Sequence, residues 1–263
     1  MRVGFVQIDS LFGDIKGNVE KVSQRLRGLS ADLLVLPELF SSGYQFVSKK
    51  EVLELSEEVP SGFTTRRLIE LAGEHRCHIV AGLPERKGKN CYNSAVLAGP
   101  EGVVGLYRKT HLFSEEKRWF KPGDTGFGVF KLGRARVGMM ICFDWIYPEA
   151  ARSLALRGAE LIAHPSNLVL PYCPEAMRTR CIENRVFAIT ANRVGSEQRG
   201  GRERLAYIGQ SQVVSVRGEV LLRASPSGEE SGIIDIDPRE ARSKRMGSFN
   251  HLLKDRRKGL YAK

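Results

Sequence analysis

Residues 137–145 read VGMMICFDW and combine a buried strand with the start of a turn. The run at 137–141 is fully apolar, which is typical of a strand buried on both faces of a sheet. It ends in the thiol of Cys142, and residues 146–156 then show a helical pattern. A strand that turns directly into a helix is characteristic of α/β proteins, whose sites lie at the carboxyl ends of strands. We therefore expect Cys142 to lie at such an edge.

The same alternation of short strands and helical patterns continues along the whole chain. We predict strands at residues 3–8, 32–36, 78–82, 93–98, 103–107, 137–141, 161–163, 187–191, 211–216, 220–222 and 233–236. We predict helices at 18–29, 64–75, 146–156 and 175–185, and a basic helix and tail after residue 236. This mixture predicts a layered sandwich in which helices cover one face of each sheet. Since no linker or repeat interrupts it, residues 1–263 are expected to form a single domain.

Composition excludes several classes of protein. The chain has 263 residues, of which 42% are hydrophobic and 27% charged, so a folded core is expected. No apolar run approaches the roughly 20 residues that a membrane-spanning helix needs. The start, MRVGFVQIDS, indicates a first strand and not a secretion signal, so the cytoplasm is the default expectation. Five cysteines without a C-x-x-C pair predict neither a disulfide framework nor a structural zinc site, and we expect no metal at His75 and His78.

The net charge of +11 raises the question of a polyanionic partner. Much of the excess lies at residues 239–245 and 254–258, where Glu240 and Asp255 interrupt the basic residues and no aromatic ladder accompanies them. This pattern favours a solvated face or a subunit contact over nucleic acid. We expect the basic tail, about residues 238–263, to take part in subunit contacts.

Three predicted strands are followed by a chemically reactive side chain. Glu38 follows the strand at 32–36, Lys109 the strand at 103–107, and Cys142 the strand at 137–141. A free thiol is only a few per cent thiolate at neutral pH, so it benefits from a base, a neighbouring cation or a helix N-terminus. Glu38 could accept the thiol proton, and Lys109 could stabilise a developing oxyanion.

Less specific interpretations of the same residues stay open at this point. Cys142 alone would more often be an inert buried thiol. A Cys–His pair would need His111 or His164 as its base, and the spacing selects neither. Asp144 is as well placed to cap the helix that follows it. The motifs of serine hydrolases, nucleotide-binding loops and zinc proteases do not occur in the sequence.

Three blocks of the sequence resemble the nitrilase superfamily of carbon–nitrogen hydrolases, which uses a Glu–Lys–Cys triad. They are VLPELFSSGY at 35–44, YRKTHLFSEEKRWFKPGD at 107–124 and GMMICFDWIYPE at 138–149. IAHPSNL at 162–168 and RTRCIENRVFAITANRVG at 178–195 extend the likeness over essentially the whole chain. The resemblance implies a four-layer α-β-β-α sandwich, commonly a homodimer, that needs no metal or cofactor. It points to the thermostable nitrilase-like and aliphatic amidase group.

The resemblance also assigns roles to individual residues. It makes Glu38 the general base, Lys109 the cation beside the tetrahedral intermediate and Cys142 the nucleophile. Glu116 matches a second family glutamate that orients the substrate, with Glu115 as its rival if the loop is shifted by one residue. The resemblance also places the backbone N–H of Phe143 at the oxyanion. It places four further side chains in the substrate pocket, which are Tyr44, Phe113, Trp145 and Asn167.

The implied reaction converts a small amide or nitrile to a carboxylic acid and ammonia through a thioester on Cys142. The sequence CFDW departs from the Cys-Trp-Glu that plant and bacterial nitrilases usually show. An N-carbamoyl amidohydrolase is the alternative, and a polyanion-binding protein that kept the fold is the alternative from another class. Arg178 and Arg180 are the candidates for binding a substrate carboxylate. Short loops favour a small substrate.

Overall fold

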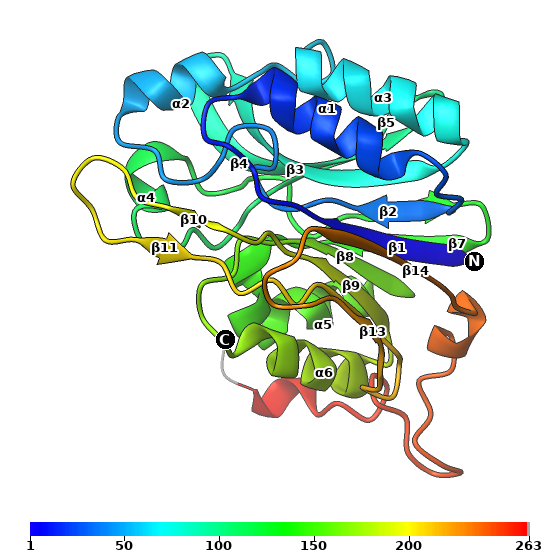
Figure 1. The fold of residues 1–263 in the computed structure, drawn as a ribbon. Helices are drawn as coiled ribbons and strands as arrows, with labels where there is room; N and C mark the ends of the chain where they lie inside the picture. Colours follow the sequence, from blue (N-terminus) through cyan, green and yellow to red (C-terminus); the bar gives the residue numbers. More distant parts are fainter. Residues whose placement is uncertain (262–263) are drawn as a thin grey trace.

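The computed structural model describes residues 1–261 (Figure 1). Two six-stranded sheets form its centre, and they have the strand orders β14-β1-β2-β3-β4-β5 and β13-β12-β9-β8-β7-β6. The first sheet comprises β14 (Glu230–Asp235), β1 (Arg2–Gln7), β2 (Leu33–Val35), β3 (His78–Lys87), β4 (Asn90–Gly99) and β5 (Gly102–Arg108). The second comprises β13 (Val220–Arg223), β12 (Gln212–Val214), β9 (Phe187–Ala191), β8 (Leu161–Pro165), β7 (Ala135–Met139) and β6 (Val129–Leu132).

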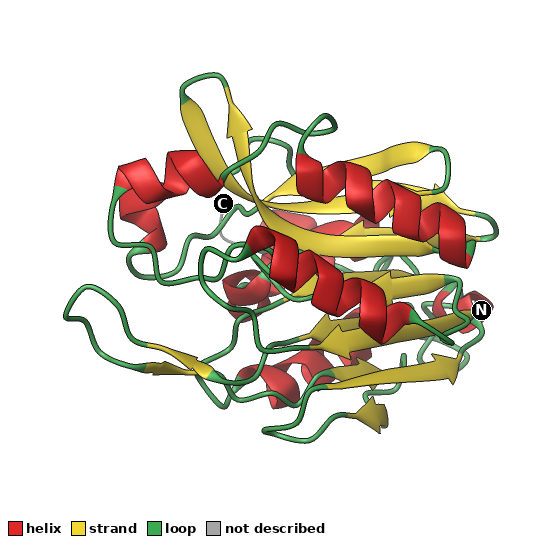
Figure 2. Ribbon diagram, turned by 45° about the horizontal axis from the view of Figure 1, so that its top comes forward, coloured by secondary structure: helices red, strands yellow, loops and turns green. Residues whose placement is uncertain are grey.

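Helices cover the outer faces of both sheets (Figures 1 and 2). Helices α1 (Ile15–Leu26) and α3 (Phe63–His75) lie on the first sheet, and α5 (Pro148–Leu156) and α6 (Cys173–Asn184) lie on the second. The inner faces of the sheets pack together, with β1 and β2 against β8 and β9. The predicted four-layer α-β-β-α sandwich is therefore confirmed.

The strand β2 shows why the central strands are apolar throughout. Leu33 and Val35 point into the core between the sheets, whereas Leu34 and Leu36 point into the core under α1 and α3. Alternate side chains of a strand leave opposite faces, so a strand covered on both sides needs apolar residues at every position. β2 pairs in parallel with β1 and β3, and β8 with β7 and β9. The carboxyl ends of these strands meet at one end of the sandwich.

Smaller elements surround that end of the sandwich. They are α2 (Lys49–Leu55), the single turn α4 (Glu116–Trp119), and the short hairpin of β10 (Ser196–Glu197) and β11 (Leu205–Ala206). Figure 1 shows α4 and this hairpin side by side at the left. The loop of this hairpin contains Gly200 and Gly201, and the sequence pattern did not indicate its two short strands.

Three predicted helices differ from the structure, and the one predicted at 18–29 lies three residues earlier, at Ile15–Leu26. The helix predicted at 146–156 begins only at Pro148, because a 3-10 turn, η1 (Cys142–Ile146), precedes it and proline is favoured in the first turn of a helix. Up to residue 261, the region after residue 236 has two short 3-10 turns, η2 (Pro238–Ala241) and η3 (Lys258–Leu260), in place of the predicted basic helix. Its sequence lacks an apolar stripe that could pack a helix onto the sandwich. Residues 262–263 of the predicted tail lie outside the described residues.

Within residues 1–261, no helix has both the length and the apolar character needed to cross a membrane.

Candidate active site

Cys142 sits on a sharp turn at the carboxyl end of the second sheet. After β7, residues 140 and 141 continue the chain and Cys142 opens η1. The backbone φ of Cys142 is +39°, in the left-handed region that is costly for a residue with a Cβ. Such a conformation persists only where the surroundings hold it, and it is often found at functional sites. The turn leaves the cysteine 6% exposed.

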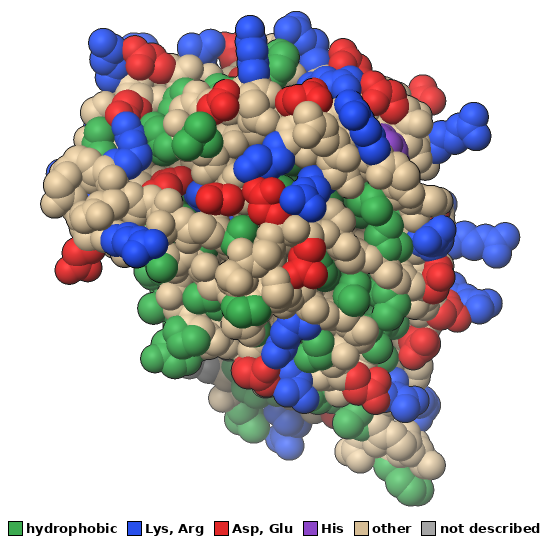
Figure 3. Space-filling model, in the orientation of Figure 1, with side chains coloured by type: hydrophobic (Ala, Val, Ile, Leu, Met, Phe, Trp, Pro, Cys, Tyr) green, Lys and Arg blue, Asp and Glu red, His purple; other side chains and the backbone are tan. Residues whose placement is uncertain are grey.

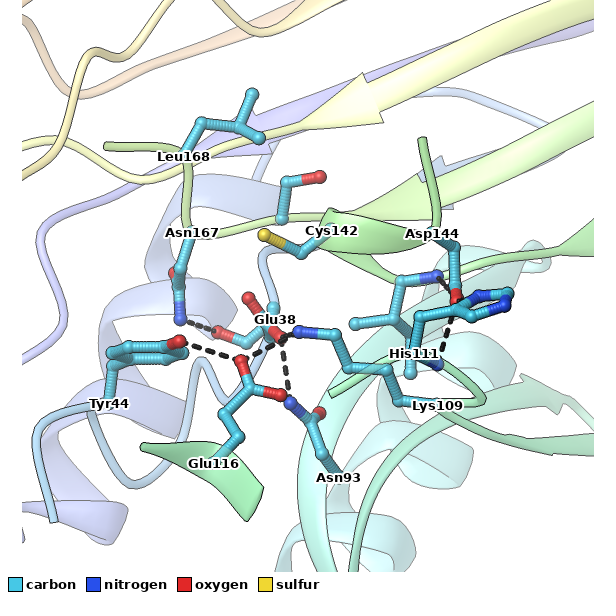
Figure 4. A network of polar contacts seen from close by, with 12 residues as sticks. Glu38, Tyr44, Asn93, Lys109, His111, Glu116, Cys142, Asp144, Asn167 and Leu168 are labelled. Carbon is cyan, nitrogen blue, oxygen red and sulfur yellow. Dashed lines mark hydrogen bonds and ion pairs between the residues drawn. The ribbon is translucent and has the colours of Figure 1, made fainter. Parts of the chain in front are cut away.

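Glu38 and Lys109 come from the first sheet and meet in front of this cysteine (Figure 4). Glu38 follows β2 and Lys109 follows β5 directly, and both side chains are fully buried. The Lys109 Nζ donates to Glu38 Oε1 at 2.6 Å and to Glu116 Oε1 at 2.7 Å. Figure 4 shows the Cys142 sulfur and the Glu38 carboxylate turned towards each other. The structure thus brings together the four residues predicted to be catalytic.

Further hydrogen bonds hold the two carboxylates in place. Asn93 Nδ2 donates to Glu38 Oε1 at 2.7 Å, and the Tyr44 hydroxyl donates to Glu116 Oε1 at 2.6 Å. Asn167 Nδ2 donates to the main-chain oxygen of Glu38 at 2.9 Å. The second oxygens of both carboxylates, Glu38 Oε2 and Glu116 Oε2, are buried without a partner among residues 1–261. Each of these two atoms can therefore still form a hydrogen bond.

Burial and mutual charge set the protonation of this cluster. Burial raises the pKa of Glu116 to about 7, with the Glu38 carboxylate adding to the rise and Lys109 opposing it. Burial by itself would lower the pKa of Lys109, but the carboxylates of Glu116 and Glu38 outweigh it and raise that pKa. Burial and then the charge of Glu38 raise the pKa of the Cys142 thiol, and Lys109 offsets only part of this. The resting site therefore contains a neutral thiol beside an ammonium.

The expected help from a helix N-terminus does not reach the thiol. Cys142 opens a five-residue 3-10 turn, and the α-helix starts only at Pro148. A helix dipole acts within the first turn of the helix. The dipole of α5 therefore does not lower the pKa of this thiol, which faces the Glu38 carboxylate (Figure 4).

The two histidines considered as alternative bases are both engaged elsewhere. His164 Nε2 donates to the main-chain oxygen of Cys142 at 2.9 Å, and its Nδ1 lies 3.1 Å from the Thr190 hydroxyl. Burial lowers the pKa of His164 to about 4, so its ring stays neutral. His111 Nδ1 lies 2.7 Å from Asp144 Oδ1. The geometry therefore favours Glu38 over either imidazole as the base.

Asp144 does not cap the helix that follows, as one interpretation of the sequence had it. Its carboxylate turns back and accepts hydrogen bonds from the backbone of Ile141 and from the side chains of Tyr107 and His111. The physical reason is that η1 separates Asp144 from α5, whose N-terminus lies beyond reach.

Two cavities open at this end of the sandwich. A narrow one of about 20 Å³ beside Cys142 is lined by four predicted pocket residues, namely Phe113, Phe143, Trp145 and Asn167, with residues 168–170. A wider one of about 420 Å³ lies over Glu116 and is lined by the predicted Tyr44 and Phe113. Phe113 lines both.

The structure also decides between the candidates that the sequence left open. The Glu115 carboxylate pairs with Arg202 at 2.5 Å and with Arg118 at 3.0 Å, so Glu116 is the glutamate that contacts Lys109. Arg178 and Arg180, considered for a substrate carboxylate, line neither cavity.

Some site residues were missed by sequence reasoning. Asn93 is in the middle of β4, where no local pattern distinguishes it from a core residue. Arg202 and Leu205 come from the β10–β11 hairpin and form part of the wider cavity wall. Only the fold brings these segments to Glu116. Across residues 1–261, no group of three or more His, Cys, Asp and Glu side chains is arranged to hold a metal ion.

Comparison with known proteins identifies the family of this chain. Residues 2–246 match the sequence profile of the family described as carbon–nitrogen hydrolase. The chain is 47% identical over 264 residues to a protein named nitrilase from Pyrococcus abyssi, with 99% of each chain covered. The crystal structure of a carbon–nitrogen hydrolase from Helicobacter pylori G27 is 29% identical, covers 99% of this chain and 97% of its own, and has a TM-score of 0.88.

A third similar protein is an amidase from Nesterenkonia sp. AN1. It is 27% identical with a TM-score of 0.78, and 93% of this chain and 96% of that chain are covered. Its structure was determined for a mutant in which acrylamide has added to the active-site cysteine. This chain belongs to the carbon–nitrogen hydrolase family, and it is an enzyme of the nitrilase and amidase type.

Proposed function

We propose that this enzyme hydrolyses a small amide or nitrile to a carboxylic acid and ammonia through a thioester on Cys142. One observation carries the proposal: a fully buried ammonium, Lys109, bridges the carboxylates of Glu38 and Glu116 in front of the cysteine on its strained turn. A buried ion pair of this kind is expensive to maintain for stability alone. A protein is expected to keep such an unfavourable ion pair where its charges act on a substrate.

In the first half-reaction, the Cys142 sulfur attacks the carbonyl or nitrile carbon while Glu38 Oε2 takes the thiol proton. The ammonium of Lys109 and the backbone N–H of Phe143 stabilise the negative charge that develops on the substrate oxygen or nitrogen. From an amide, Glu38 passes the proton to the departing nitrogen and ammonia leaves. A thioester remains on the sulfur.

In the second half-reaction, Glu38 accepts a proton from a water molecule, which attacks the thioester carbon. The acid is released and Cys142 recovers its proton. A nitrile first forms a thioimidate, and addition of one water with loss of ammonia converts it to the same thioester. No metal or cofactor takes part in this scheme.

Glu116 is proposed to orient the substrate. Its Oε1 is occupied by Lys109 and Tyr44, so the free Oε2 is the atom that can meet the substrate. Because its pKa is about 7, a protonated Oε2 that can donate a hydrogen bond is well populated near neutral pH.

The narrow cavity beside the thiol supports a small acyl group. The nitrilase name of the Pyrococcus abyssi relative and the amidase name of the Nesterenkonia protein support the two substrate classes. The acrylamide adduct in that amidase supports a nucleophilic cysteine in this fold. N-carbamoyl compounds carry the same amide group and form the alternative substrate class.

We also propose that the chain, as a single domain, forms a homodimer through the face of α5 and α6 together with the basic tail. Exposed apolar side chains lie in or next to these helices and in the tail, namely Ile146, Leu156, Tyr172, Ile182, Leu260 and Tyr261. Apolar patches of this kind are typical of protein contacts. Light scattering of the purified protein tests this, and a monomeric mass for the active enzyme would contradict it.

Nucleic acid is not the proposed partner. On the face shown in Figure 3, Lys and Arg side chains are interspersed with Asp and Glu side chains. Many are in ion pairs, such as Arg25 with Glu229 and Arg199 with Glu51. A binding surface for a polyanion would need a continuous basic stripe.

The test is ammonia release from small nitriles, their amides, ω-amides and N-carbamoyl amino acids. Cys142→Ala is the blank, and Cys91→Ala is the matched control because Cys91 is buried to the same 6% exposure. We expect release that Cys142→Ala abolishes and Cys91→Ala retains. Equal release by the wild type and Cys142→Ala on every substrate would refute the proposed function. The preferred substrate then shows whether the enzyme acts on nitriles, on amides or on N-carbamoyl compounds.

A further inference from the structure

Asp144 is a fully buried carboxylate whose two oxygens are both saturated with hydrogen bonds (Figure 4). Its Oδ1 accepts from the backbone N–H of His111 at 3.1 Å and from the His111 ring at 2.7 Å. Its Oδ2 accepts from the backbone N–H of Ile141 at 2.9 Å and from the Tyr107 hydroxyl at 2.7 Å. Nothing in the reaction described above uses this group.

The four donors belong to the two chain segments that carry the reacting groups. Ile141 immediately precedes the nucleophile Cys142, in the segment that follows β7 of the second sheet. Tyr107, on β5 of the first sheet, lies two residues before Lys109, and His111 lies two residues after it in the loop that follows β5. The Asp144 carboxylate therefore connects the turn that carries Cys142 to the segment that carries Lys109, across the interface between the two sheets.

The partners of Asp144 are themselves held rigidly. The His111 ring stacks on Tyr147 with 3.7 Å between ring centroids and an angle of 15°. The Tyr107 ring stacks on Phe127 at 5.5 Å. Burial and the charge of Asp144 raise the pKa of Tyr107, so its hydroxyl remains a donor. The carboxylate is thus fixed from both sides.

The conformation of Cys142 explains why such a tie is needed. A positive φ at a residue with a Cβ relaxes unless hydrogen bonds on either side oppose the relaxation. Asp144 receives the N–H that precedes Cys142, and its own N–H donates to the oxygen of Ile141 at 3.0 Å. Without the hydrogen bonds of this carboxylate, the strained turn would relax and the distance between Cys142 and Lys109 would change.

We propose that Asp144 is a positioning residue that sets the Cys142 sulfur against the Lys109 ammonium. The inference rests on the proposed function, because it concerns the geometry of the same reaction. Asp144 acts through Ile141, Tyr107 and His111 and does not touch the substrate. Its loss lowers kcat and leaves substrate binding nearly unchanged.

Two substitutions of His111 separate its hydrogen bond from its packing. His111→Asn keeps a donor at the place of Nδ1 and loses the stacked ring. His111→Phe keeps a ring on Tyr147 and loses the donor. Asp144→Asn removes the charge directly, and Tyr92→Phe is the control because Tyr92 is a buried tyrosine of β4 that packs on Arg108.

The measurements are kcat and KM for the preferred substrate, and the rate at which acrylamide adds to Cys142, followed by intact mass. In that addition the sulfur bonds to the terminal vinyl carbon and the thiol proton goes to the carbon beside the carbonyl. Displacements of about 1 Å can cost on the order of 10² in rate. We expect Asp144→Asn and His111→Phe to lower kcat and the acrylamide rate by about 10- to 100-fold, with KM within about threefold.

His111→Asn and Tyr92→Phe are expected to stay within about threefold of the wild type in both rates. The proposal is overturned if folded Asp144→Asn reacts at the wild-type rate. It is also overturned if His111→Asn loses as much as His111→Phe, since the ring and not the hydrogen bond would then matter. A wild type that neither releases ammonia nor adds acrylamide would instead overturn the proposed function itself.

Discussion

Replacing Lys109 with methionine removes the positive charge that two buried carboxylates share. Its Nζ lies 2.6 Å from Glu38 and 2.7 Å from Glu116, and the three side chains are at most 4% exposed. Losing one partner of a buried ion pair costs about 3–5 kcal/mol of unfolding free energy, because the remaining charge is uncompensated. If Lys109 stabilises the oxyanion as we propose, its loss lowers kcat by about 10²–10³.

The loss of stability should depend on pH with a defined sign. Without the ammonium, burial and mutual repulsion raise the pKa of the carboxyl groups above the values of the unfolded chain. At pH values between the unfolded and the folded pKa, the folded variant binds protons that the unfolded chain does not bind. The free energy of unfolding of the variant therefore rises as the pH falls. We expect Lys109→Met to lose about 3–5 kcal/mol at about pH 8 and clearly less at about pH 5.5.

Urea unfolding followed by tryptophan fluorescence at both pH values measures this difference. Lys117→Met is the matched control, because Lys117 is exposed on α4 beside the same glutamate. It should change the free energy of unfolding by less than about 0.5 kcal/mol. If Lys109→Met loses the same amount at both pH values, or less than about 1 kcal/mol at the higher one, our electrostatic account of the cluster is wrong.

Three other substitutions test the surroundings of this cluster. Tyr44→Phe removes a hydrogen bond that lowers the pKa of Glu116, so the limb of the pH–rate profile near 7 should move to higher pH; an unmoved limb would mean that Glu116 does not produce it. Glu116→Gln should gain stability relative to the wild type as the pH rises from about 4.5 to about 7, by an amount on the order of 1–3 kcal/mol. A carboxyl group whose pKa is raised in the folded protein stabilises the fold at pH values below its unfolded pKa, and this contribution is lost as the pH rises through the folded pKa. Parallel stability curves for the wild type and the variant would contradict this account. Arg202→Gln breaks the ion pair with Glu115 at the wall of the wider cavity and should change KM with kcat within about threefold; a change in kcat alone would show that the loop acts on the chemistry.

The candidate residues Glu38, Lys109 and Cys142 could be located in the sequence because each follows a predicted strand, whereas Glu116 lies on α4 and was placed by the family resemblance. Runs such as LLVL before Pro37 and GMMI before Cys142 are apolar at every position, so the places where they end are visible without a structure. Glu38 and Cys142 follow strands of two different sheets, so their proximity depends on how the two sheets pack and did not follow from the strand pattern alone. The family resemblance then supplied the order of roles.

Other parts of the site could not be predicted, because they depend on contacts between distant segments. Asn93 bonds Glu38 across 55 positions of sequence, and Tyr107 bonds Asp144 across 37. Neither residue carries a local pattern that distinguishes it from a core residue. The state of the Cys142 thiol was unpredictable for the same reason, since its pKa reflects burial and the nearby charges.

By itself, the sequence determined the strands other than β6, β10 and β11, the helices α1, α3, α5 and α6 to within a few residues, and the identity of the candidate reactive side chains; it did not predict α2 or α4. These depend on periodicity and on residue type, which are local properties. The tertiary structure alone decided that Glu116 and not Glu115 meets Lys109, that Asp144 ties the turn to the opposite sheet, and that the thiol rests neutral. Those outcomes depend on distance and on exclusion of water, and only packing of the two sheets sets either quantity.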